Sequence, residues 1–189
     1  MALDHYAADS RILDAYQKNV TDFLDGALHG DPIYVPVDSM GLESIRAGNG
    51  FDAAQTSGCR MYTVQPDGSV VSAELGDWED GGQVRVRGIH GGEIPKRLLD
   101  YIRQAAQLKE VAVYNFRVRL LTVPALRLEA LRLTCEDTHK NLFIPVVAGD
   151  ARFRSKTLFQ ADEFLLLLRE AAEARLPDVD KEVDYSLSS

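Results

Sequence analysis

The sequence predicts one α+β domain in which a mainly antiparallel sheet of five or six strands packs with three main helices. Two observations carry this prediction. Three segments repeat apolar residues every three or four positions, as amphipathic helices do, and several shorter segments alternate apolar and polar residues between turn signals. The length of 189 residues fits a single domain. We expect this domain over residues 1–177 and a polar tail over residues 178–189.

The N-terminal quarter begins with a predicted helix over Leu3–Leu28, which glycines end. Ile33–Val37 has the composition of a short strand, and Pro36 within it indicates an edge position because proline cannot donate to a ladder. Met40–Ala47 predicts a short helix. The stretch Phe51–Gly58 shows no period and receives no assignment.

A hairpin is predicted next. Cys59–Gln65 and Ser69–Leu75 read as strands, and Pro66-Asp67-Gly68 between them is a strong turn signal. An acidic, glycine-rich loop follows, and then a third strand over Gln83–Ile89. A helix is expected over Glu93–Leu108, where Pro95 suits a first turn.

The C-terminal half alternates from Val111 to Val123, which predicts a long strand. In Leu126–Cys135 the apolar phase slips by one residue. A strand with a β-bulge explains the slip, and a short helix is the alternative; we favour the strand. Asn141–Val147 predicts another strand, and Gln160–Leu176 the last helix.

Composition limits the classes of partner. The formal net charge of −8 disfavours nucleic acid, which binds proteins through neutralised phosphates. No apolar run approaches the ~20 residues that span a bilayer, so no membrane is expected. Two cysteines and a start without a secretion signal predict a cytoplasmic protein.

Motifs that carry chemistry are missing from the sequence. It contains neither a nucleophile elbow nor a phosphate-binding loop, and no two of its four histidines stand three or four residues apart. We therefore predict no catalytic residue, no metal and no cofactor. Cys59 and Cys135 are expected to be small buried side chains.

Two local features could bind a ligand or partner. His90 precedes two glycines and a helix start, an arrangement that can hold an anion or simply form a turn. Trp78 lies in the acidic loop, either folded onto the core or displayed for a partner.

The arginines are the most informative feature. Arg85 and Arg87 share one strand face, and Arg117 and Arg119 share another. Arg127 and Arg132 follow on the next strand. If these strands are neighbours, the arginines form a platform for carboxylates or phosphates. Alternatively, Glu and Asp from helices or loops, such as the five acidic residues of the first helix, neutralise them.

These observations support two hypotheses of different class. The first, which we favour, is a non-catalytic cytosolic protein of bacterial, adaptor type that binds another protein, with self-association left open. The second is an enzyme or small-anion-binding protein with a cleft near the turn Gly88–Gly92 and an arginine-lined sheet face. A deep pocket that holds a histidine or cysteine beside the arginines favours the second hypothesis, and a flat exposed patch favours the first.

Overall fold

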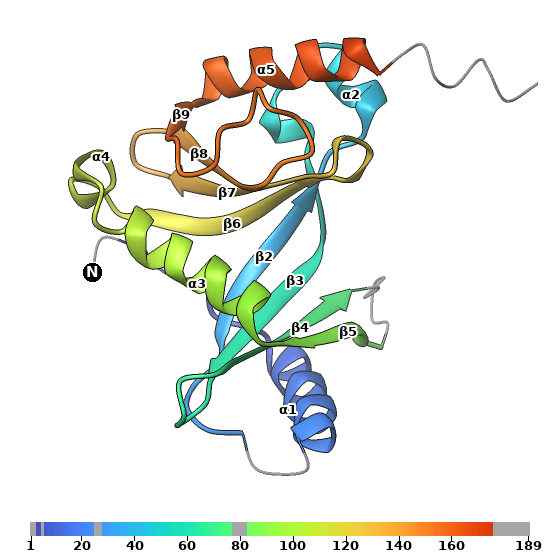
Figure 1. Cartoon of the computed structure of the whole chain (residues 1–189), viewed down its shortest axis with the longest axis vertical. Helices are drawn as coiled ribbons and strands as arrows, with labels where there is room; N and C mark the ends of the chain where they lie inside the picture. Colours follow the sequence, from blue (N-terminus) through green and yellow to red (C-terminus); the bar gives the residue numbers. More distant parts are fainter. Residues whose placement is uncertain (1–2, 5, 25–27, 77–82, 176–189) are drawn as a thin grey trace, which may run out of the picture.

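A computed structural model describes residues 3–4, 6–24, 28–76 and 83–175. Within these residues, nine strands form one mixed sheet with the order β5-β4-β3-β2-β6-β7-β8-β9, and β1 pairs with β6 beside this path. Figure 1 shows that the sheet bends sharply between β2 and β6, so that its two halves face each other across an angle. The predicted acidic loop with Trp78 and the predicted tail lie outside the described residues.

The strands are β1 Leu3–Asp4, β2 Ile33–Ser39, β3 Gln55–Val64, β4 Val70–Gly76, β5 Arg85–Gly91, β6 Phe116–Val123, β7 Leu128–Cys135, β8 Lys140–Val147 and β9 Phe159–Gln160. The α-helices are α1 Ser10–Leu24, α2 Leu42–Arg46, α3 Glu93–Ala105, α4 Lys109–Ala112 and α5 Ala161–Ala174. Two short 3₁₀ turns, Phe51–Ala53 and Pro124–Leu126, complete the secondary structure.

The prediction of five or six antiparallel strands is wrong. The sheet is larger and mixed, because β1 and β2 both run parallel to β6. The β3–β4 hairpin, β5 and the helices α2, α3 and α4 separate β2 from β6 along the chain. The turn signals in the sequence therefore gave no indication of this pairing. β1 and β9 have two residues each, too few for any period. The α+β class remains.

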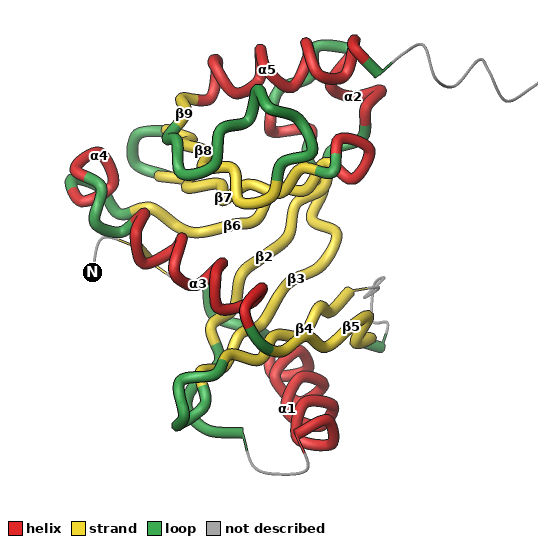
Figure 2. The backbone as a smooth tube through the Cα atoms, in the orientation of Figure 1, coloured by secondary structure: helices red, strands yellow, loops and turns green. Residues whose placement is uncertain are grey.

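The bend comes from how little β2 and β6 pair. Only Val37–Ser39 face Leu120–Thr122, and below that point the two strands diverge, as the tube in Figure 2 shows. β1 takes the vacated edge of β6, opposite Phe116 and Arg117. The predicted edge position of Pro36 is therefore wrong, since β2 is central. Its pairing with β6 begins one residue after the proline.

Three helices cover the bent sheet. α3 fills the inner angle, and its Leu98 and Ile102 share one core with Tyr62 of β3 and Leu133 of β7, one strand from each half. α1 covers the outer face of β3 and β4, with Tyr16 and Val20 fully buried. α5 covers the outer face of β6 to β8, around Phe164 and Leu168. Each face of the sheet thus has a core.

Capping and packing explain two shifted boundaries. α1 begins at Ser10 rather than Leu3, because the Asp9 carboxylate accepts a 2.8 Å hydrogen bond from the Arg11 amide and caps the helix. The strand predicted from Val111 begins only at Phe116. The turn α4 comes first, and it buries Val111 completely.

Two sequence predictions about strands are confirmed. β3 and β4 form the hairpin expected around Pro66-Asp67-Gly68. Leu128–Cys135 is a strand, as favoured, but the bulge predicted within it is wrong, because β7 pairs with β6 without a shift and the extra residue against β8 is Val146 of β8. The apolar phase slips because both faces of β7 are buried, with Leu128 in the core beneath α5 and Leu131 in the core beneath α3. The chain from Phe51 to Gly58, left unassigned, holds a 3₁₀ turn and the start of β3. No helix among the described residues is long and apolar enough to cross a membrane.

The C-terminal helix offers a test of the core. Leu168 is fully buried and Leu166, two residues away, is 56% exposed. We expect Leu168→Ala to lower the free energy of unfolding by about 2–5 kcal/mol, through lost burial and a cavity. Leu166→Ala is the matched control, with a change within about 0.5 kcal/mol. Urea denaturation measures both; equal losses would contradict the packing of α5.

The thiols offer a second test. Cys59 and Cys135 are free, buried and in separate core clusters, and burial raises the pKa of Cys59 to about 12. Reaction needs an exposed thiolate. We expect Ellman's reagent at pH 8 to label neither thiol quickly in the folded protein and two per chain in denaturant. A denatured count of zero would indicate a disulfide.

Candidate functional site

A cleft opens in the inner angle of the sheet, at the N-terminal end of α3. It consists of two adjoining cavities of about 510 and 330 Å³, which share Arg60, Glu74, Glu129 and Val147 as lining residues. The larger, cavity 1, is lined in addition by Val37, Ser39, Ser57, Gly58, Cys59, Leu75, Arg87, Thr122, Pro124, Arg127 and Leu128. The smaller, cavity 2, adds Tyr62, Ser72, His90, Ile94, Pro95, Arg97, Leu98 and Val146. Volumes of this size suit small ligands.

An ionic cluster lies where the two cavities meet. Arg60, on β3, donates from both Nη atoms to the two oxygens of Glu129, on β7, at 2.8 and 2.7 Å. Its Nε lies 2.8 Å from Oε1 of Glu74, on β4. The Arg60 side chain is 19% exposed. This cluster joins the two halves of the bent sheet with charge-assisted hydrogen bonds.

Electrostatics keep the cluster charged. Burial by itself lowers the pKa of Arg60, but the hydrogen bonds and charge of Glu129 outweigh it, so the pKa lies above its ordinary value. Burial raises the pKa of the neighbouring Tyr62, so its phenol stays neutral. Because Nε and both Nη atoms of Arg60 already have partners, this side chain connects the two halves of the sheet.

Three register shifts in the described part of the sheet converge on the cleft. Ser57 is the extra residue between β2 and β3, Arg87 between β4 and β5, and Val146 between β7 and β8. All three extra residues line the cleft. A β-bulge turns side chains away from the regular alternation of a strand. The bulges therefore shape this one surface.

Glycines give the cleft residues room. The Arg87 side chain lies across Gly76, where an added Cβ would be 2.7 Å from the guanidinium carbon. The His90 ring lies over Gly88, where a Cβ would be 3.1 Å from Nε2. At Gly58 a Cβ would meet the Leu75 carbonyl at 2.3 Å, so only glycine fits the close approach of β3 and β4.

The cleft is more basic than the rest of the chain. Its lining includes four arginines, Arg60, Arg87, Arg97 and Arg127, and two carboxylates, Glu74 and Glu129. His90 places its Nε2 4.0 Å from Glu74. A local excess of positive charge in a chain of net charge −8 favours anions at this place.

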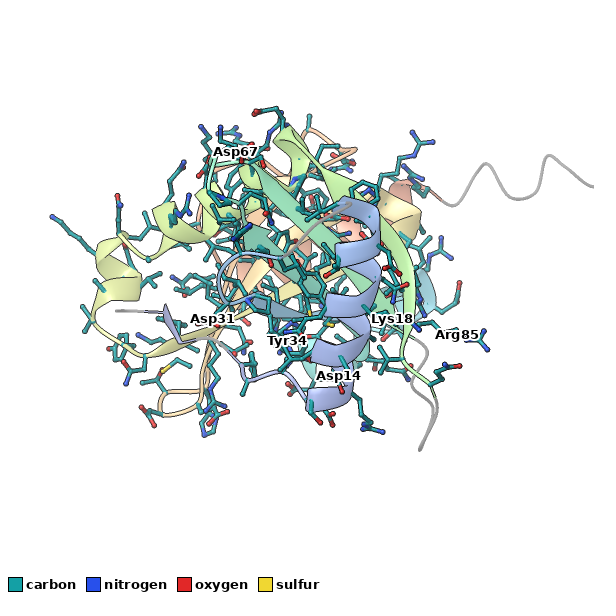
Figure 3. All side chains as sticks on the ribbon, turned by 90° about the horizontal axis from the view of Figure 1, so that it is seen from below. Asp14, Lys18, Asp31, Tyr34, Asp67 and Arg85 are labelled. Atoms are coloured by element: carbon teal, nitrogen blue, oxygen red, sulfur yellow. The ribbon has the colours of Figure 1, made fainter. Side chains whose placement is uncertain are left out.

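The predicted arginine platform is divided in the structure. Arg85 and Arg87 lie on β5, at one edge of the sheet, and three strands separate them from β6. Arg87 and His90 line the cleft, whereas Arg85 points away from the molecule (Figure 3). Arg117 and Arg119 alternate with the inward residues of β6, so they lie on the outer face. Trp78 lies outside the described residues.

Arg119 and Arg132 surround a buried carboxylate on that outer face. Asp38 of β2 is 2% exposed and accepts from Arg119 Nε at 2.7 Å and from Arg132 Nη1 at 3.3 Å. Thr56 donates to the same carboxylate. The hydrogen bond to Asp38 raises the pKa of Arg119, and burial lowers that of Arg132. Here one acidic side chain of the protein pairs with two arginines, and it comes from a strand rather than from the helices or loops that were expected.

Sequence reasoning missed Arg60, Glu74, Glu129 and Arg97. Arg60 carried a signal, because it stands between Cys59 and Met61 in a strongly apolar strand, where an unpaired charge is costly. No sequence pattern indicated its partners Glu74 and Glu129, since they lie 14 and 69 residues further along the chain. No group of three or more metal-ligating side chains occurs among the residues that the structure describes.

Comparisons with known proteins give no relative. No family model, no curated protein and no solved structure matches this chain.

The outer cluster generates a prediction about the arginines of β6. Arg119→Ala should lower the free energy of unfolding by about 3–5 kcal/mol, because it removes a main partner of the buried Asp38 carboxylate. Arg117→Ala is the matched control. Its side chain is 38% exposed and pairs with Glu136, which is 71% exposed, so we expect a loss below about 1 kcal/mol. Thermal and urea unfolding measure both, and a negligible loss for Arg119→Ala would mean that Asp38 does not need it.

Proposed function

We propose that this chain is a cytoplasmic, non-catalytic binding protein for a small organic anion, which it holds in the cleft of the bent sheet. The observation that carries the proposal is the convergence of three β-bulges, at Ser57, Arg87 and Val146, on one cleft. Bulges interrupt ladder pairing and recur beside functional sites.

Charge supports an anion as the ligand. Arg60 is engaged by its two glutamates, but Arg97 and Arg127 are exposed, and neither guanidinium has a hydrogen bond or ion pair to another described residue. A guanidinium grips a carboxylate or phosphate through paired N–H donors. The pocket also holds a histidine beside arginines, the arrangement that favours a ligand-binding protein.

Binding rather than catalysis is proposed because the cleft lacks an activated nucleophile among its described residues. Cys59 lines cavity 1, but its side chain packs in the core beneath α1 and its raised pKa disfavours the thiolate. The two free cysteines are compatible with the reducing cytoplasm that the sequence predicts.

The hypothesis of a protein partner stays a prediction. The large exposed apolar side chains of the described chain are spread over several elements: Phe23, Val64, Ile94, Val113, Val147 and Leu166. Of these, Ile94 and Val147 both line cavity 2, and Val147 also lines cavity 1. A partner that inserts a side chain there would compete with the proposed ligand.

An NMR titration of the full chain tests the proposed function. We expect benzoate and phenyl phosphate to shift the amide signals of Gly58, Leu75 and Gly88 in a saturable way, because the excess of arginine attracts either acid. Benzylamine, the cationic counterpart, should not shift them. The response should weaken as salt rises.

A pair of variants on one strand provides the control. Arg87→Gln should weaken the benzoate response, whereas Arg85→Gln, which removes the same charge outside the cleft, should leave it nearly unchanged. Equal responses to benzoate and benzylamine would contradict the proposal. The absence of a saturable shift up to about 10 mM benzoate would also contradict it, because this concentration exceeds the dissociation constant of even a weak specific complex.

A further inference from the structure

We infer, on the basis of the proposed function, that the ligand is an amphipathic anion whose acid group lies in cavity 1 and whose apolar part lies in cavity 2. The Arg60–Glu74–Glu129 cluster separates the two cavities and contributes to the lining of both. The two compartments differ in chemistry, and this difference specifies the ligand.

Cavity 1 has the polar lining that an acid group needs. Arg127 contributes an exposed guanidinium group, and Ser39 contributes a hydroxyl. The hydroxyls of Ser57 and Thr122 also line the cavity, where they donate to the backbone carbonyls of Val37 and Asp38. Arg127 sits in a left-handed conformation with φ 49°, at the turn that ends η2. An oxyanion beside Arg127 and Ser39 obtains a charge-assisted hydrogen bond from the guanidinium and a second hydrogen bond from the hydroxyl.

Cavity 2 presents apolar surface to solvent. Ile94, at the start of α3, is 77% exposed, and Val147, at the end of β8, is 48% exposed. Pro95, Leu98 and Val146 line the same cavity. When a ligand covers exposed apolar side chains at a concave site, their removal from water makes the free energy of binding more favourable.

The ionic cluster favours one orientation of the ligand. Glu74 and Glu129 line both cavities, and their charge disfavours an acid group placed against them. Cavity 1 adds the exposed Arg127 and the Ser39 hydroxyl, whereas cavity 2 adds Arg97 beside the exposed apolar side chain of Ile94. The acid group is therefore better placed in cavity 1, and the apolar part continues past the cluster toward Ile94.

Four probes of related structure test the inference by NMR titration: octanoate, octyl phosphate, 1-octanol and acetate. Octanoate or octyl phosphate should bind at least about tenfold more tightly than either acetate or octanol. Acetate lacks the apolar chain that cavity 2 would hold, and octanol lacks the acid group that cavity 1 would hold. The stronger of the two acids identifies the acid group, and either preference supports the inference.

Variants on each side of the cluster locate the two ends of the ligand. Arg127→Gln should weaken octanoate about tenfold and leave octanol unchanged, because a charged hydrogen bond is lost. Ile94→Ser should weaken octanoate and octanol about threefold to tenfold and leave acetate unchanged. Arg85→Gln and Leu166→Ser, exposed positions outside the cleft, are the matched controls. Circular dichroism should confirm that all four variants fold.

The outcomes separate this inference from the proposed function. If acetate binds the cleft as tightly as octanoate, the protein still binds anions but the amphipathic ligand is wrong. If Arg97→Gln weakens octanoate and Arg127→Gln does not, the assigned orientation is overturned. If no anion shifts the cleft signals, the proposed function fails as well.

Discussion

The short parallel contact between β2 and β6 determines the shape of this protein. Three residues on each strand pair, from Val37 to Ser39 and from Leu120 to Thr122, and the strands then separate. A sheet joined by so narrow a contact can fold back on itself, and α3 fills the resulting angle with apolar side chains. Because α3 begins only at Glu93, the outer part of the angle stays open and forms the cleft.

Two ionic clusters on opposite faces stabilise the sheet near this contact. Asp38 binds Arg119 and Arg132 on the outer face, and Arg60 binds Glu74 and Glu129 on the inner face. Both clusters connect strands from the two halves. Removing one member of such a buried cluster is costly, because the remaining charges lose their compensation. The arrangement restrains the angle between the halves and thereby the width of the cleft.

The sequence predicted local structure well and global arrangement poorly, for physical reasons. The hairpin around Asp67 and the strand Leu128–Cys135 are encoded by neighbours in the chain, and both were predicted. The parallel pairing of β2 with β6 depends on contacts about 80 residues apart, which no local pattern records. Separation along the chain also explains why the ionic cluster of the site was not predicted. Arg87 and His90 could be singled out as strand and turn residues, but nothing nearby indicated that Arg60 would meet Glu129.

The bulge at Arg87 also affects the outer boundary of the sheet. β5 is the last strand of its half, so one side of its backbone has no neighbouring strand in the described chain. Exposed strand edges of this kind can recruit another chain and start aggregation. The irregular backbone at Arg87, together with the charge of Arg85 beside it, breaks the flat run of donors and acceptors that such recruitment requires. The residue that shapes the cleft therefore also protects the sheet from uncontrolled strand addition.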